Sequence, residues 1–132
     1  MVLTNAGRDH ALACVYTTSA QPAAGNYMAV SANATAPSTA STTLPGEITT
    51  GGGGLVRAQG TYAHTGGQAT ATLSKTFTAN GSDSLPVTLA KVGILNATPT
   101  GGTLVHETLL NATSTLTISG DSTTITETVT AS

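Results

Sequence analysis

The chain has 132 residues, the size of one domain, and a chain of this length can bury about two-thirds of its unfolded surface. Charged residues make up only 8%, and the net charge is −2, so no basic surface is available for binding nucleic acid or an anionic membrane. Aromatic residues make up 3%, and the abundant Thr, with Val and Ile, favours sheets over helices.

The N-terminal segment predicts a short helix. Thr4 or Asn5 can cap a helix that runs to about Ala13. Charged and polar residues at positions 8–10 interrupt the apolar stretch that a signal peptide needs, and no run approaches the roughly 18 apolar residues of a membrane span. We therefore expect a protein that acts in the cytoplasm or leaves it by another route, such as assembly into a particle.

A short strand is predicted at residues 26–31, and a long irregular segment follows at residues 32–54. Pro37, Pro45 and the glycines at 51–54 exclude both a regular ladder and a helix. Loops of this length inside a compact domain are uncommon and are usually functional or disordered. We interpret this Gly/Pro/Ser/Thr-rich segment as a loop or arm that orders against a neighbour. Whether it is ordered before assembly stays open.

From residue 55 the apolar residues alternate with period two, which predicts strands. In ATATLSKTFTA (residues 69–79) one face carries Ala69, Ala71, Leu73, Lys75, Phe77 and Ala79, and the other carries Thr and Ser. Residues 55–65 are the expected partner strand, joined to it by a hairpin turn at Gly66 and Gly67. Further strands are predicted at 86–96, 103–110, 115–119 and 123–130, with a turn at Gly120 and Asp121 before the last.

Seven short strands with frequent turn signals predict an all-β fold. We expect an antiparallel β-sandwich with a short N-terminal helix, and a jelly-roll connection of its strands is one alternative. The whole chain, residues 1–132, is expected to form a single domain. The strand order stays open. NATPTGG, residues 96–102, reads as a reversal between two strands. Pro99 fixes one backbone angle, and Gly101 and Gly102 can adopt the positive φ of a tight return.

No constellation of residues predicts a reaction, a metal or a cofactor. His10, His64 and His106 lack a second ligand at a metal-binding spacing, and Cys14 reads as a small buried hydrophobe. There is no GxSxG motif, and the glycines at 51–54 lack the Lys and the helix of a phosphate-binding loop. We therefore expect a protein that is not an enzyme.

Isolated basic residues lie within the strand patterns. We expect Arg57, Lys75 and Lys91 at sheet edges, where an inward-pointing lysine discourages unwanted pairing. In the alternative interpretation they pair with carboxylates such as Glu47 or Glu107 of an adjacent subunit.

Four stretches together resemble a family of small virion proteins of tailed bacteriophages. They are LTNAGRDHALA, ATAPSTASTTLPGEI, GLVRAQGTYAHTGG and KVGILNATPTGGTLVHETLL, which span most of the chain. The resemblance implies a β-rich structural component, found either as a capsid decoration protein or as a tail- or fibre-associated module. It implies no catalytic residue.

Composition and resemblance together predict a noncatalytic virion protein assembled in the host cytoplasm. Our first expectation is a decoration, or cement, protein that stabilises the shell by contacts with the major capsid protein. It would be a homo-oligomer, for which a trimer suits local threefold positions. The candidate contacts are Pro37, Leu44, Pro45, Glu47 and Arg57.

Two alternatives stay open. One is a tail-tip, baseplate or fibre module that contacts tail proteins and the host through exposed turns. The other is a carbohydrate-binding module, which is disfavoured because the chain has no Trp and only three Tyr.

Overall fold

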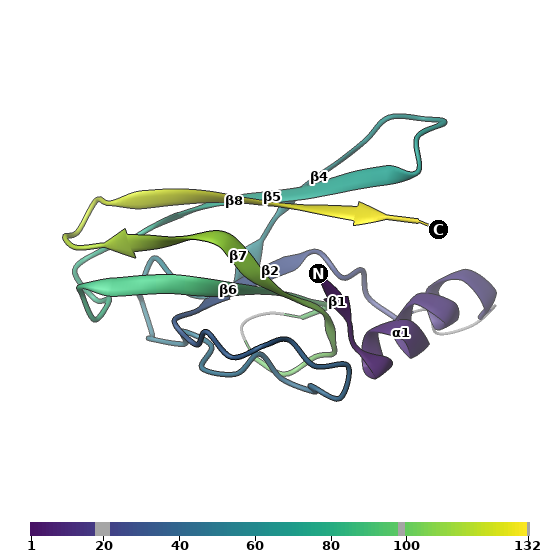
Figure 1. The fold of residues 1–132 in the computed structure, drawn as a ribbon, viewed down its shortest axis with the longest axis horizontal. Helices are drawn as coiled ribbons and strands as arrows, with labels where there is room; N and C mark the ends of the chain where they lie inside the picture. Colours follow the sequence, from purple (N-terminus) through teal and green to yellow (C-terminus); the bar gives the residue numbers. More distant parts are fainter. Residues whose placement is uncertain (18–21, 98–99, 132) are drawn as a thin grey trace.

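A computed structural model describes residues 1–17, 22–97 and 100–131. In these residues the chain forms two antiparallel sheets and one short helix, so the all-β prediction is confirmed (Figure 1). One sheet has the strand order β1-β7-β6-β2-β3, and the other has the order β4-β5-β8. In chain order the elements are β1 (Val2–Leu3), α1 (Asn5–Tyr16), β2 (Tyr27–Ser31), β3 (Ala58–Gln59), β4 (Thr61–His64), β5 (Thr70–Thr78), β6 (Val87–Leu95), β7 (Leu104–Leu116) and β8 (Ser122–Thr130).

The main core lies between the two sheets. On β5 the inward residues Leu73 and Phe77 are buried and the alternate Thr residues face outward, as the period-two pattern predicts. The buried side chains that form this core are Met28, Val30, Leu55, Leu73, Phe77, Ala79, Leu89, Val92, Ile94, Leu116 and Ile125. Both sheets contribute to it, so the core holds the two layers together.

Two strand predictions were wrong in detail. The single strand expected at residues 55–65 is divided at Gly60 into β3 of one sheet and β4 of the other. A Cβ at Gly60 would lie 2.8 Å from Leu73 Cγ, so glycine lets the chain turn this corner against the core. The strands expected at 103–110 and 115–119 belong to one strand, β7, which pairs with β6 on both sides of an irregularity: Leu109 lies opposite Lys91, and Ser114 lies opposite Leu89.

The helix begins as predicted but ends later. The Thr4 hydroxyl accepts a hydrogen bond of 2.9 Å from the Gly7 amide, so Thr4, one of the two predicted residues, is the N-cap. The helix α1 continues to Tyr16 instead of Ala13. Gly7 allows close packing on β7, because a Cβ there would lie 2.1 Å from the Val105 carbonyl oxygen. The short strand β1, which pairs with β7, was not predicted.

Two pairs of sequential strands are hairpins. β4 and β5, like β6 and β7, are antiparallel neighbours, whereas the chain passes from one sheet to the other after β5 and again after β7. Gly101 and Gly102 have φ of 72° and 78°, as expected for the return after β6, whereas Pro99 lies outside the described residues. Gly120, with φ of 97°, forms the predicted turn before β8.

Candidate functional site

Residues 32–54 are here called the loop layer. The part up to Glu47 covers the outer face of the five-stranded sheet, and the rest continues to the turn at Asp83, whose carboxylate accepts a hydrogen bond from the Gly54 amide. Figure 1 shows this segment, in dark blue, beside that sheet on the side away from β5 and β8. The segment is irregular, as predicted, except for one bridge between Ser31 and Glu47. The segment does not form the extended arm that the sequence predicted. Leu44 instead packs in a second small core with Ala29, Leu95 and Leu104 of the same chain.

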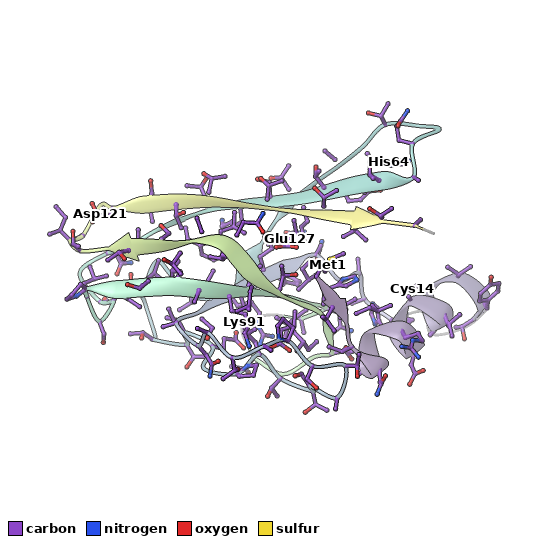
Figure 2. All side chains as sticks on the ribbon, in the orientation of Figure 1. Met1, Cys14, His64, Lys91, Asp121 and Glu127 are labelled. Carbon is purple, nitrogen blue, oxygen red and sulfur yellow. The ribbon has the colours of Figure 1, made fainter. Side chains whose placement is uncertain are left out.

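A buried ion pair lies beneath the loop layer. Lys91 Nζ of β6 is 2.6 Å from Glu107 Oε1 of β7, and the two side chains are 0% and 1% exposed. Figure 2 shows Lys91 on the loop side of its sheet. The ammonium also donates to Thr35 Oγ1 at 3.3 Å, and the Ser38 amide donates to Glu107 Oε2 at 3.5 Å. The pair therefore attaches the loop layer to the sheet.

The environment of Glu107 favours its charged form. Burial alone would raise the pKa of this carboxyl, but hydrogen bonds from Lys91, Ser41 and Ser38, with the charge of Lys91, lower it below its ordinary value. A buried carboxylate of this kind is stable only while its partners remain in place.

Arg57 fixes the other end of the loop layer. Its Nε and Nη2 donate to the two carboxylate oxygens of Glu47 at 2.9 and 2.8 Å, a bidentate pair. Its Nη1 donates to the carbonyl oxygens of Ala97 and Gly101 at 2.8 and 2.7 Å. One guanidinium thus joins the loop layer to the turn between β6 and β7. The geometry uses the planar donor fork that only arginine offers.

The structure brings most of the predicted contact residues together, but it directs several of them inward. Leu44 and Arg57 are 3% and 7% exposed, and Pro37, Pro45 and Glu47 are half-buried. The Ser31 hydroxyl donates to the Pro45 carbonyl at 2.6 Å. The surface that the loop layer presents is therefore made by its exposed Ala, Ser and Thr residues, which sequence reasoning did not single out.

The predicted position of the basic residues at sheet edges was wrong for Lys75 and Lys91. β5 lies in the middle of the three-stranded sheet, and β6 lies inside the five-stranded one. The carboxylates named as partners were the right ones for Arg57 and Lys91, but both ion pairs form within one chain.

A regular hydroxyl surface covers the outside of the three-stranded sheet. In all five outward-facing pairs between β5 and β8, each residue is Thr or Ser. Two of these pairs are joined by side-chain hydrogen bonds, 2.9 Å between Ser74 and Thr126 and 2.7 Å between Thr76 and Thr124. We call this surface the hydroxyl face; it consists of Thr70, Thr72, Ser74, Thr76, Thr78, Ser122, Thr124, Thr126, Thr128 and Thr130.

Most of the charged side chains interact with other groups of the same chain. The chain has four basic and six acidic residues, and four of these ten form the two internal ion pairs. The carboxylates of Asp83 and Asp121 accept hydrogen bonds from backbone amides of nearby turns. Glu127 is buried between the layers, where the Thr108 hydroxyl donates to it at 3.2 Å (Figure 2). The loop layer and the hydroxyl face consequently carry almost no free charge.

Burial affects the two titratable groups at the inner side of β7 and β8. It raises the pKa of Glu127, and the hydrogen bond from Thr108 offsets only part of this effect. Burial also lowers the pKa of His106, with a further contribution from the N-terminal amine, so this imidazole is neutral near pH 7.

A half-open pocket of about 590 Å³ lies between α1 and the ends of both sheets. Its wall is mainly apolar and includes Leu73, Ile94 and Val105. Cys14, which Figure 2 places on α1, is half-buried, and its Sγ lies 3.6 Å from His10 Nε2. Cys14 was expected to be a small buried residue, and it instead lines the wall of this pocket.

Neither a protein-family model nor a curated protein matches this chain. In the described part of the chain, no helix is long and apolar enough to cross a membrane, and no three His, Cys, Asp or Glu side chains gather as metal ligands.

Proposed function

We propose that this protein is a noncatalytic structural component of a tailed-bacteriophage virion, and that it decorates and stabilises the capsid shell. The observation that carries the proposal is the near absence of free charge on two surfaces of the protein. Soluble proteins ordinarily rely on surface charge to stay apart from one another. Here two large surfaces, the loop layer and the hydroxyl face, are polar but almost uncharged. Such surfaces suit lasting contact with neighbouring proteins.

The loop layer is the proposed contact with the major capsid protein. Its exposed Ser, Thr and backbone groups can form neutral hydrogen bonds, each worth about 1 kcal/mol net. Binding strength would come from repetition of these bonds, and from multivalency if several copies act together. The loop layer is already held by Leu44 and by both ion pairs, so little ordering entropy would be lost on binding. In this proposal the loop layer binds as a preformed surface of a β-sandwich, and not as the arm that the sequence predicted.

A binding experiment with preformed shells tests this proposal. Shells that lack the protein are titrated with purified wild-type protein, which should bind saturably at a copy number matched to the capsomers. Thr42→Lys adds a charge to an exposed position of the loop layer and should abolish binding. Thr65→Lys is the matched control at the exposed turn after β4, and it should bind like the wild type.

The outcomes separate the alternatives. Wild-type protein that does not bind shells would overturn the decoration function, and attachment to isolated tails would favour the tail module. Saturable binding that Thr42→Lys leaves intact would keep decoration but reject the loop layer as its contact surface.

A further inference from the structure

On one side of the two-layer fold, the edge strands of both sheets have unpaired backbone groups in the described part of the chain. β8 is the last strand of the order β4-β5-β8, and within the described residues its second edge has no strand partner. On the same side, β1 pairs with β7 only at His106 and Glu107, so the rest of that edge is also free in the described part of the chain. A polar groove of about 430 Å³ runs between β7 and β8. Free backbone donors and acceptors along such edges are templates for pairing with another strand.

β8 lacks most of the features that protect exposed edges. It has nine residues, without proline or lysine, and it pairs with β5 over its whole length without a register shift. By comparison, the other end strands β1, β3 and β4 have two, two and four residues. Natural sheets normally keep their free edges short, charged or irregular. Glu127 is the one charged residue of β8, and it points between the layers toward Thr108.

The sequence of β8 is also complementary to itself. In an antiparallel pair of two β8 strands centred on Thr126, Thr124 faces Thr128 and Ser122 faces Thr130. Each outward pair would again join two hydroxyl residues, as the pairs between β5 and β8 already do. The hydroxyl face would continue without interruption from one copy to the other.

We propose that β8 pairs antiparallel with β8 of a second copy of this chain, about a twofold axis at Thr126. The two three-stranded sheets become one six-stranded sheet, and the open sides of the two molecules face each other. The interface is isologous, so the association closes at the dimer. This inference does not depend on capsid decoration and concerns the purified protein alone.

Sedimentation equilibrium of the full chain tests the proposal. The wild type should have a mass of about 26 kDa, twice the 13.0 kDa of one chain. Thr126→Lys places two like charges opposite each other at the axis and should weaken dimerisation by at least roughly tenfold. Thr76→Lys adds the same charge to the same face, one strand away, and should leave the dimer intact. Mixing Thr126→Lys with Thr126→Asp should restore a dimer, because opposite charges then meet.

Hydrogen exchange of the wild type gives a second measurement that needs no variant. Amides of β8 should exchange more slowly as protein concentration rises, whereas amides of the β4 edge should not change. A wild type that stays monomeric, or that has the mass of a trimer, would overturn the proposal. Equal dimerisation of Thr126→Lys and Thr76→Lys, or concentration-independent exchange in β8, would overturn it as well.

Discussion

Removal of Lys91 should strongly destabilise the fold and release the loop layer. Lys91→Met leaves the Glu107 carboxylate buried, at 1% exposure, without its 2.6 Å cationic partner. Breaking a buried pair in this way costs about 3–5 kcal/mol. Domains are stable by only about 5–15 kcal/mol, so this loss is a large fraction of the total. Urea unfolding followed by circular dichroism gives the difference in free energy of unfolding.

The double variant Lys91→Met/Glu107→Met is the matched control. It removes both charges and keeps similar side-chain volumes, so most of the lost stability should return. The loop layer should still exchange its amides faster than in the wild type, because the contacts to Thr35 and Ser38 are gone. A double variant as unstable as the single one would show that the uncompensated charge is not the cause.

The pH dependence of Lys91→Met provides an independent check. In the wild type the pKa of Glu107 is lowered, so its stabilising contribution is present above the ordinary value of 4.5 and is lost as pH falls through the folded pKa. In the variant, burial without Lys91 should raise this pKa, so the folded state favours the protonated carboxyl. The stability difference between the two proteins should therefore begin to narrow above pH 4.5, where the buried carboxyl of the variant takes up a proton, and should narrow further below pH 4.5, where the wild type loses its contribution. A difference that is constant from pH 7 to pH 4 would refute the reasoning.

Three further substitutions test the remaining contacts. Arg57→Lys loses the bidentate geometry and should cost about 1.5–3 kcal/mol, with faster amide exchange in the turn between β6 and β7; unchanged exchange there would contradict the clamp. Gly7→Ala should cost about 1–3 kcal/mol in thermal unfolding because the added Cβ meets β7, whereas Gly66→Ala, with open space around it, should stay within about 0.5 kcal/mol of the wild type. Glu127→Gln should stabilise the protein at pH 7, because the raised pKa makes the ionised form costly; this gain should disappear below pH 4.5, and a gain that persists there would argue against burial as the cause.

Local patterns were enough to predict much of the sheet structure. The alternation in residues 69–79 identified the buried face of β5, and Gly66 and Gly67 located its hairpin. Residue type alone narrowed the helix cap to Thr4 or Asn5, and the structure shows that it is Thr4. These features depend on neighbours within a few positions, which a sequence displays directly. The break at Gly60 was missed because it depends on packing against Leu73 of another strand.

The sequence named Glu47 and Glu107 as possible partners of the basic residues, but it could not predict that these ion pairs form within one chain, because that depends on strand register. Lys91 and Glu107 meet only because β6 and β7 pair in one particular alignment. Arg57 donates to the Ala97 carbonyl, which is 40 residues away in the sequence, and no local sequence pattern indicates this contact. One signal was available: Leu44 is a large apolar residue within a long polar segment, and such a residue indicates burial.

Electron microscopy of virions that contain the protein tests the central claim most directly. Copies should be distributed over the whole shell, with the loop layer toward the major capsid protein. Density confined to the tail or to a single vertex would contradict capsid decoration.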